Sequence, residues 1–290
     1  MAGRVRGPLR GVRRSGRRAA GENGRVDHQS PVSSLTATQV DAYLARIGVG
    51  RPERPDAASL AVLQEAHLRA VPFENLAIHL GEPIVLEPAA LLDKLVARRR
   101  GGFCYELNGA FAELLRALGF RVELLGARVF GDGRLGPPFD HLALRVDLAE
   151  PWLVDVGFGR FSHRPLRLDV RDGQQDPGGV FTVTAHGPDL DVAMDGSPQY
   201  RLDPRPYELA DFVPTCWWQA TSPASHFTRS TTCSRLTDDG GRITLSGSRL
   251  IRTSAGGERE ERVLTDPESL AAYRAHFGVE LDRLPRPADG

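Results

Sequence analysis

The spacing of apolar residues along this 290-residue chain changes at Gly119, and that change limits the folds that the chain can adopt. Before Gly119, apolar side chains recur every three or four positions, as in 111–118, which is the period of a helix. Beyond it they alternate with polar ones, as in "HLALRVDL" (141–148), which is the period of a strand. A helical pattern returns in "DPESLAAYRAHFG" (266–278). We therefore predict an α+β fold in which a helical part precedes mostly antiparallel strands, with no internal repeat.

Local signals place the individual elements. Thr36 and Gln39 form a capping-box pattern that starts a first helix, and Gly48 ends it. A last helix is predicted to be capped by Asp266. Three more helices are predicted over 59–70, 89–99 and 104–118. Strands are predicted over 121–129, 141–148, 152–156, 165–170, 180–185, 191–194 and 242–251.

The net charge of zero hides an uneven distribution. Residues 1–34 hold eight arginines against one glutamate and one aspartate, a net charge of +6, so the rest of the chain carries −6. Because this arm has almost no aliphatic pattern, it cannot bury enough surface to offset its chain entropy, and we expect a disordered extension. Alternative interpretations are a nucleic-acid or membrane contact, a targeting segment, or a start codon assigned too early. The folded part is expected to begin near Leu35.

Composition argues against several classes of protein. No apolar run reaches the roughly 20 residues of a membrane-spanning helix, and no secretory signal pattern stands near the N-terminus. Three cysteines at wide spacing (Cys104, Cys216 and Cys233), without a C-x-x-C pair, favour neither a disulfide framework nor a zinc site. We expect a cytoplasmic protein with no metal, no membrane contact and no nucleic-acid partner.

One cysteine stands where a nucleophile is expected. Cys104 follows Gly101 and Gly102 and starts a predicted helix. The positive end of a helix and its unpaired N–H groups favour the thiolate, and the two glycines leave the sulfur unobstructed. A nucleophilic cysteine also needs a base and a group that orients the base. His141 and Asp155, which lie on successive predicted strands with the same parity, complete a candidate triad.

Pattern alone leaves alternatives to this triad open. A cysteine near a helix start is more often a small buried hydrophobe than a nucleophile. A symmetric hairpin turning at 149–151 would set Asp155 opposite Arg145, so the triad needs an offset of the strands or a bulge that carries His141 towards Asp155. A metal site on the three candidate residues is disfavoured, because they include no ligand pair of the usual spacing.

Five segments resemble the arylamine N-acetyltransferase family, in the family's order. "VPFENLAIHLGEPI" (71–84) resembles its P-F-E-N-L segment, and "RRRGGFCYELN" (98–108) its nucleophile motif R-G-G-x-C-x-E-x-N. "DHLALRV" (140–146) resembles its histidine strand, "WLVDVGFG" (152–159) its aspartate strand with the following glycine loop, and "SPASHFTRSTTCSRLTDDG" (222–240) its C-terminal segment. The resemblance leaves only the Arg-rich arm outside it.

The resemblance implies a three-part architecture with a triad like that of papain-type proteases. It implies a helical bundle over 35–118 that carries the cysteine, a β-barrel over 119–222 that carries the histidine and the aspartate, and an α/β lid over 223–290. The roles of acyl-accepting nucleophile, base and orienting acid then fall to Cys104, His141 and Asp155.

The resemblance also implies residues around the triad. Support around the nucleophile is implied for Arg100, Glu106 and Asn108, for which a salt-bridged scaffold is the alternative. The amine pocket is implied to be lined by Phe73 and Phe158, which pattern alone would place in the core. For the phosphates of acetyl-CoA the candidates are a glycine turn and hydroxyls of the C-terminal segment: Gly157, Gly159, Ser225, Thr231 and Ser234. His226 and Arg229 do not belong to the family pattern.

The implied activity is ping-pong acetyl transfer. Acetyl-CoA acylates Cys104, CoA leaves, and an arylamine or arylhydrazine takes the acetyl group from the thioester. The implied enzyme uses acetyl-CoA as cosubstrate and no metal, and it is a monomer or homodimer. Two alternatives stay open: an amide synthase of the same family that closes a macrolactam from a carrier-bound polyketide, and a nonenzymatic binding module in which Cys104 is structural.

Overall fold

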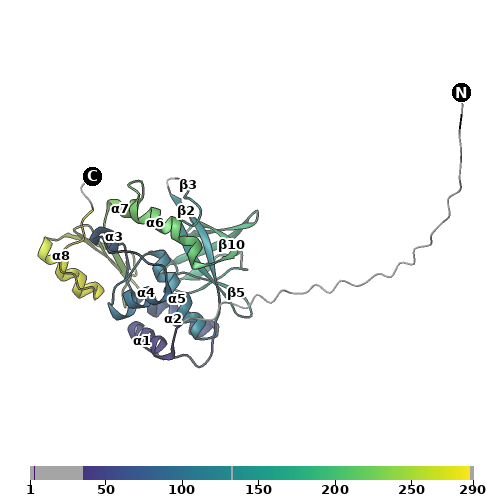
Figure 1. Cartoon of the computed structure of the whole chain (residues 1–290), viewed down its shortest axis with the longest axis horizontal. Helices are drawn as coiled ribbons and strands as arrows, with labels where there is room; N and C mark the ends of the chain where they lie inside the picture. Colours follow the sequence, from purple (N-terminus) through teal and green to yellow (C-terminus); the bar gives the residue numbers. More distant parts are fainter. Residues whose placement is uncertain (1–2, 4–34, 132, 288–290) are drawn as a thin grey trace.

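The structure is a computed structural model that describes residue 3, residues 35–131 and residues 133–287. The predicted extension over 1–34 lies, apart from residue 3, outside the described residues. Figure 1 shows the early helices (purple and blue) at the bottom, the long strands (teal and green) to the right and the C-terminal segment (yellow) to the left. Within the described part of the chain, no helix has the length and apolar character needed to cross a bilayer.

Helices occupy the N-terminal third, as predicted. The first, α1 (Ala37–Ile47), starts at the expected capping box, in which Thr36 Oγ1 accepts from Gln39 N at 3.3 Å, and it ends at Gly48. The second, α2 (Ala57–Ala70), begins two residues before the predicted Ser59, because Asp56 caps it. The others are α3 (Leu76–Leu80), α4 (Pro88–Leu92), the π-helical turn η1 (Asp93–Ala97) and α5 (Cys104–Ala117). Residues 104–115 are all buried, so α5 is the central helix.

A nine-stranded antiparallel sheet follows and curls into a nearly closed barrel. Its order is β6-β5-β4-β2-β10-β9-β8-β7, with β3 paired to β2. The end strands meet through the Gln174 side chain, which exchanges two hydrogen bonds of 2.7 and 2.9 Å with the backbone of Arg167. The strands are β2 (Arg121–Gly131), β3 (Arg134–Leu135), β4 (His141–Asp147), β5 (Pro151–Val154), β6 (Leu166–Arg167), β7 (Gln174–Asp176), β8 (Gly179–His186), β9 (Asp189–Met194) and β10 (Ser197–Tyr207).

The alternation predicted for β4 separates two cores. Leu142, Leu144 and Val146 pack into the core that the sheet shares with the helices, while Ala143 packs into the barrel interior. Successive side chains of a strand point to opposite faces, so His141, at the start of β4, shares the barrel-interior face with Ala143. Because α5 packs on the other face of β4, the cysteine helix and the histidine strand are in direct contact.

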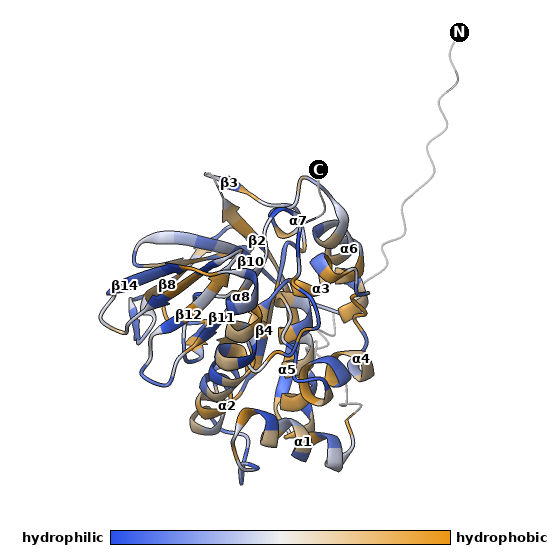
Figure 2. Ribbon diagram, turned by 90° about the vertical axis from the view of Figure 1, so that its left-hand side faces the viewer, coloured by the Kyte–Doolittle hydropathy of each residue, from blue (hydrophilic) through white to orange (hydrophobic). Residues whose placement is uncertain are grey.

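The C-terminal part is a second antiparallel sheet, of order β1-β11-β12-β13-β14. Figure 2 shows its strands beside helix α8. Its first strand, β1 (Phe73–Glu74), comes from the helical part and pairs with β11. The remaining elements are η2 (Leu209–Phe212), α6 (Val213–Thr221), α7 (His226–Arg229), β11 (Thr232–Leu236), β12 (Arg242–Ser246), β13 (Arg249–Thr253), β14 (Arg259–Val263), α8 (Asp266–Ala272) and the π-helical turn η3 (Tyr273–Phe277).

Two predictions for this part were wrong in detail. The single strand expected over 242–251 is a hairpin, because Gly247, with a φ of 58°, turns the chain between β12 and β13. The N-cap of α8 is Thr265, and not Asp266, which is the first helical residue. Strands β10, β11 and β14 were not predicted, since their polar and proline-containing segments lack a clear alternation.

Candidate active site

The glycine pair before the cysteine is required by the packing of its loop against the segment at β1 and against Glu106 of α5. A Cβ on Gly101 would lie 1.9 Å from Pro72 O, and one on Gly102 would lie 2.7 Å from Glu106 Cβ. Gly102 O also accepts from Glu74 N at 2.8 Å, so the loop and β1 run side by side. This close approach explains the two glycines, rather than the predicted clearance around the sulfur.

Two buried ion pairs hold the chain on either side of the cysteine. Lys94 Nζ lies 2.6 Å from Glu106 Oε1, and Glu106 Oε2 accepts from Phe103 N at 3.3 Å where α5 begins. Arg100 Nη2 lies 3.0 Å from Glu74 Oε1. Burial would raise the pKa of Glu74, but Lys94 and Arg100 outweigh it and lower that pKa. This geometry fits the scaffold alternative for Arg100 and Glu106.

Asn108 ties α5 to the strands that carry the candidate base and acid. Its Nδ2 donates to Leu142 O at 2.7 Å and to Asp155 Oδ1 at 2.9 Å, and its Oδ1 accepts from Val156 N at 2.9 Å. The side chain is completely buried. One amide therefore fixes β4 and the residues after β5 relative to the cysteine helix.

Each oxygen of the Asp155 carboxylate has two donors. Oδ1 accepts from Asn108 Nδ2 and from Gly157 N, both at 2.9 Å. Oδ2 accepts from His141 Nε2 at 2.7 Å and from Tyr200 Oη at 3.3 Å. Because a carboxylate only accepts, Nε2 of His141 carries a proton and Nδ1 is left as the acceptor nitrogen of the neutral ring.

The register of β4 and β5 answers the geometrical objection to a triad. Val154, the last residue of β5, lies opposite Leu144. Asp155, the next residue, therefore lies opposite the position two residues after His141. A symmetric hairpin would have placed it opposite Arg145. Diagonal neighbours on one face of a sheet are within reach of long side chains. An offset of the strands, one of the two solutions foreseen, thus joins acid and base.

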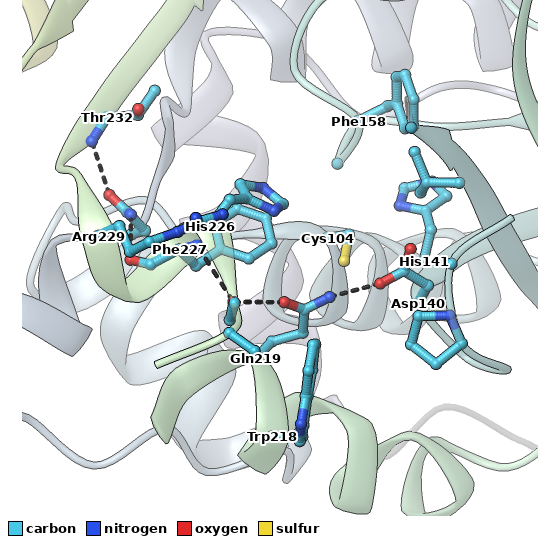
Figure 3. A pocket seen from close by; sticks show the side chains of 18 of the residues that line it. Cys104, Asp140, His141, Phe158, Trp218, Gln219, His226, Phe227, Arg229 and Thr232 are labelled. Carbon is cyan, nitrogen blue, oxygen red and sulfur yellow. Dashed lines mark hydrogen bonds between the residues drawn. The ribbon is translucent and has the colours of Figure 1, made fainter. Parts of the chain in front are cut away.

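His141 lies on the pocket wall beside the cysteine. Its ring packs edge-on against Phe158, with ring centroids 5.1 Å apart, and is tilted against Tyr200 at 5.2 Å. Figure 3 shows the Cys104 sulfur within the pocket next to His141. Cys104 and His141 therefore line one pocket, and His141 is hydrogen-bonded to Asp155 behind it.

The Cys104 thiol differs from the sequence prediction in its acidity. Burial raises its pKa well above the ordinary value; a hydrogen bond from the Leu142 amide opposes this rise, and the Asp155 and Asp140 carboxylates add to it. From the sequence we expected the helix N-terminus to favour the thiolate, but the pKa is raised and not lowered. A buried thiol with a raised pKa needs a base to take its proton before it can act as a nucleophile.

Cys104 and His141 line a cavity of about 560 Å³ between the barrel and the C-terminal part, the main pocket, which has a usual size for a small-molecule site. Phe73 and Phe158, predicted to line the amine pocket, both line it. Two exposed arginines, Arg134 and Arg229, also line it, and within residues 35–131 and 133–287 neither takes part in an ion pair. Nor do the described residues contain a group of three or more His, Cys, Asp or Glu side chains that could hold a metal ion.

The residues predicted to bind the acetyl-CoA phosphates are largely engaged within the protein. Gly157 N donates to Asp155, and a Cβ on Gly157 would lie 2.7 Å from Cys104 Cα, so this glycine serves a close approach of backbones. Ser225 lines the pocket, but its hydroxyl caps α7 and donates to Gln219 Oε1 at 2.6 Å. Three candidates do not line the pocket: Gly159, Thr231 and Ser234.

Sequence reasoning missed a polar chain across this pocket (Figure 3). Gln219 Nε2 donates to Asp140 Oδ1 at 2.5 Å, Ser225 Oγ donates to Gln219 Oε1, and Phe227 N donates to Ser225 Oγ at 3.2 Å. The chain links the residue before His141 to α6 and to the start of α7. Only the place of Asp140 beside the histidine could have pointed to it, because Gln219 carries no motif and its partner is 79 residues away.

Comparisons with known proteins agree on one family. A family model described as N-acetyltransferase matches residues 56–285. The arylamine N-acetyltransferase of Mycolicibacterium smegmatis is 37% identical over 261 residues, which are 86% of this chain and 94% of that protein. A Salmonella typhimurium protein named arylamine N-acetyltransferase / N-hydroxyarylamine O-acetyltransferase is 35% identical, over 83% of this chain and 89% of its own length.

Solved structures have the same fold. The Salmonella typhimurium arylamine N-acetyltransferase superimposes with a TM-score of 0.79 at 34% identity, over 84% of this chain and 92% of that one. The Mycobacterium marinum enzyme in complex with CoA gives 0.76 at 33% identity, over 83% and 92%. The predicted α+β fold is thereby confirmed. On a likeness that spans more than four fifths of its length, the chain belongs to the arylamine N-acetyltransferase family.

Proposed function

We propose that the protein transfers an acetyl group from acetyl-CoA, through a thioester on Cys104, to the nitrogen of an arylamine or arylhydrazine. Relatives named arylamine N-acetyltransferase, one of them solved with CoA, support the reaction and its two substrates. Within this chain, the observation that carries the proposal is the set of four donors on Asp155, one of them His141, which lines the same pocket as Cys104.

In the first half-reaction the thiol proton of Cys104 passes to Nδ1 of His141, and the thiolate attacks the carbonyl carbon of the acetyl-CoA thioester. Cys104 is the first residue of α5, so N–H groups of the first turn supply donors for the oxyanion. The bond from carbon to the CoA sulfur then breaks, and His141 returns the proton to that sulfur. Asp155 stabilises the imidazolium between the two transfers.

In the second half-reaction the amine enters the vacated site and attacks the acetyl carbon on Cys104. His141 takes a proton from the amine nitrogen and returns it to the cysteine sulfur as the thioester bond breaks. Phe73, Phe158 and Phe227 surround the aryl ring and limit the entry of water, which would hydrolyse the intermediate. Thioester exchange is nearly balanced and amide formation is downhill, so the second step drives the reaction.

Intact mass after brief mixing with acetyl-CoA, without amine, tests the proposal. The expected result is a gain of one acetyl group, which is lost on addition of an arylamine and absent in Cys104→Ala. Cys216→Ala is a matched control that should retain the gain, because that cysteine lies outside the main pocket. A gain that persists in Cys104→Ala, or no gain in folded wild-type protein, would contradict the proposal.

The same experiment separates the alternatives, which the comparisons do not favour. A macrolactam-forming enzyme would be acylated by a bulky carrier-bound thioester and not by acetyl-CoA. A nonenzymatic binding module would be acylated by neither.

Further properties remain proposals. We divide the chain into a bundle (35–118), a barrel (119–222) and a lid (223–290), although β1 pairs the first part with the third. The three cysteines are free thiols, which fits the reducing cytoplasm. We expect a monomer or homodimer with no membrane or nucleic-acid partner. Light scattering coupled to size-exclusion chromatography measures the oligomeric state.

A further inference from the structure

A second, smaller cavity lies where loops of the barrel meet the C-terminal sheet. Its volume is about 170 Å³. The loop after β5 contributes Arg160 and His163, and β12 contributes Arg242. Much of the remaining wall is glycine: Gly178, Gly240, Gly241 and Gly257. Neither the predicted site residues nor the proposed reaction uses this cavity.

The glycines keep this cavity open. A Cβ on Gly241 would lie 2.4 Å from Thr253 O, and one on Gly178 would lie 2.6 Å from Phe161 O. Gly240 has a φ of 81°, in the left-handed region that favours glycine. The backbone therefore passes close to its neighbours at several points of the wall, and no side chain from these positions fills the space.

The two arginines of the cavity have no acidic partner. Arg242 Nη1 donates to Ser234 Oγ at 3.1 Å, which is a neutral acceptor. Among the residues that the structure describes, neither Arg160 nor Arg242 takes part in an ion pair, unlike Arg201, which lies 2.7 Å from Asp191. Burial, and after it the charge of Arg160, lower the pKa of Arg242 to about 10. Two cations held together in a partly buried place cost free energy unless an anion joins them.

Two acidic residues, Asp176 and Asp239, accept hydrogen bonds from the segments that form the cavity. Their carboxylates already have these donors as partners. Asp176 accepts from three backbone N–H groups, at 2.7, 2.8 and 3.0 Å. Asp239 accepts from Gly241 N at 3.2 Å and from the Thr237 hydroxyl at 2.5 Å. Neither carboxylate lines the cavity. The lining itself is therefore cationic and, among the described residues, holds no carboxylate, and the nearby charges of Asp176 and Glu65 act on the pKa of His163 and not on that of Arg242.

We propose that this cavity binds a phosphate group between Arg160 and Arg242, with the His163 ring as a further donor. Guanidinium groups match phosphate oxygens in geometry and charge. The volume is well below the roughly 300–1,000 Å³ of sites for drug-sized ligands, and a cationic lining around so small a space suits one phosphate-sized anion. Because Arg160 belongs to a barrel loop and Arg242 to β12, the anion would also fasten the C-terminal sheet to the barrel.

Two short segments connect the lining of this cavity to that of the main pocket, so the phosphate has two candidate sources. Phe158 lines the main pocket, and Arg160, two residues later, lines the small cavity. Thr232 of β11 lines the main pocket, and Ser234, on the same face of that strand, accepts from Arg242. The phosphate is therefore a free ion or a phosphate of CoA whose thiol end lies at the triad.

Thermal unfolding with added inorganic phosphate tests the site without reference to activity. At ten times the dissociation constant, phosphate should raise the melting temperature of the wild type by about 3 to 5 °C, relative to chloride at equal ionic strength. The rise should be absent in Arg160→Ala, and it should persist in Arg249→Ala, which removes an exposed arginine of β13.

The Arg160→Ala variant is the more informative one, because Arg160 is exposed and its loss leaves the fold intact. Without phosphate its melting temperature should equal or exceed that of the wild type, since a repulsion with Arg242 is removed. Arg242→Gln should also abolish the phosphate effect. An equal rise in the wild type and in both variants, or no rise in the wild type, would overturn the site.

A second measurement identifies the source of the phosphate. The melting temperature is compared in the presence of CoA and of 3′-dephospho-CoA, in the wild type and in Arg160→Ala. If the stabilisation that depends on Arg160 requires the 3′-phosphate, the ligand is the cosubstrate. If only inorganic phosphate produces it, the ligand is a free ion. Both outcomes support the site, and failure of the proposed acetyl transfer would leave the phosphate titration unaffected.

Discussion

Asn108 and Asn75 hold opposite walls of the main pocket, and the two walls differ in the charges that they carry. Asn108 makes three hydrogen bonds of 2.7 to 2.9 Å to β4 and to the segment around the end of β5. Asn75 likewise makes three, of 2.7 to 2.9 Å, to backbone groups of α7 and its flanks up to β11. Behind the wall of Asn108 lie the buried Asp155 and His141, which are hydrogen-bonded to each other, and the exposed Arg134 lines the pocket at the rim of this wall. The wall behind Asn75 carries the exposed Arg229, which has no ion pair among the described residues.

The difference shows which part of the chemistry the fold prepares in advance. On the barrel wall, Asp155 meets its donors before any substrate arrives, so the free energy of orienting His141 is spent during folding. On the C-terminal wall, the ordered polar groups bond to each other and the free charge is left for a ligand. Changes to the barrel wall should therefore lower kcat, and changes to the C-terminal wall should raise KM.

The largest effect is expected from Asp155→Asn. Both oxygens of this carboxylate face donors, so an amide in either orientation turns its NH₂ group towards a donor. His141 would lose its orientation and the stabilisation of its imidazolium, and kcat/KM should fall about 10³-fold or more. Steady-state kinetics with acetyl-CoA and an arylamine measure the loss.

Tyr200→Phe is the matched control for that variant. The Tyr200 hydroxyl gives the longest of the four bonds, 3.3 Å, and the remaining three suffice to hold the carboxylate. Its kcat/KM should fall less than about tenfold, because this bond is long and three shorter bonds still hold the carboxylate. Equal losses in the two variants would break the distinction between orienting charge and general packing.

The next prediction concerns the rate at which the Cys104 thiol is alkylated. Burial raises the pKa of all three cysteines, but among the residues that the structure describes only Cys104 shares a pocket lining with an imidazole. At pH 7 iodoacetamide should therefore alkylate Cys104 first, and His141→Gln should slow that alkylation about 10²-fold. A raised thiol pKa means less thiolate at a given pH, so the rate in His141→Gln should recover only above about pH 9. Mass spectrometry of the alkylated peptides, with Cys216 and Cys233 as internal references, checks this result.

Truncating the two asparagines compares the walls directly. Asn108→Ala should lower kcat about 10²-fold with little change in KM, because Asp155 loses a donor and shifts relative to Cys104. Asn75→Ala should raise the KM for acetyl-CoA and leave kcat within about threefold. Unfolding by urea serves as the stability control for both variants. A kcat loss of the same size in Asn75→Ala would contradict the division of roles.

The sequence was sufficient to predict the site residues that lie in elements with a periodic pattern of apolar side chains. The alternation in 141–148 placed His141 and Ala143 on one face of β4, and the glycine pair with the following helix placed Cys104 at its start. The offset of β5 could not be read in this way, because the hairpin had been centred on 149–151 and only the packed register sets Asp155 beside His141.

The phosphate contacts were the weakest prediction, and the reason is physical. Glycines and hydroxyls in loops serve backbone geometry and caps as readily as ligands, and the structure gives Gly157 and Ser225 such uses. Long-range packing decides which polar groups have a partner within the protein. Gln219, 79 residues away in the sequence, donates a hydrogen bond to Asp140, whereas Arg229 has no ion pair among the described residues. No local pattern distinguishes an occupied polar group from a free one.

The smallest effect is expected from Arg229→Ala, and it bears most directly on the comparison of the walls. An exposed arginine contributes up to about 1 kcal/mol to binding an anion, so the KM for acetyl-CoA should rise about threefold to fivefold with kcat unchanged. Added salt should reduce this difference, since exposed charges are screened. Arg249→Ala, on β13, should leave both constants unchanged. If Arg229→Ala instead lowers kcat at unchanged KM, the C-terminal wall takes part in the chemical step, and its free charge is not reserved for binding.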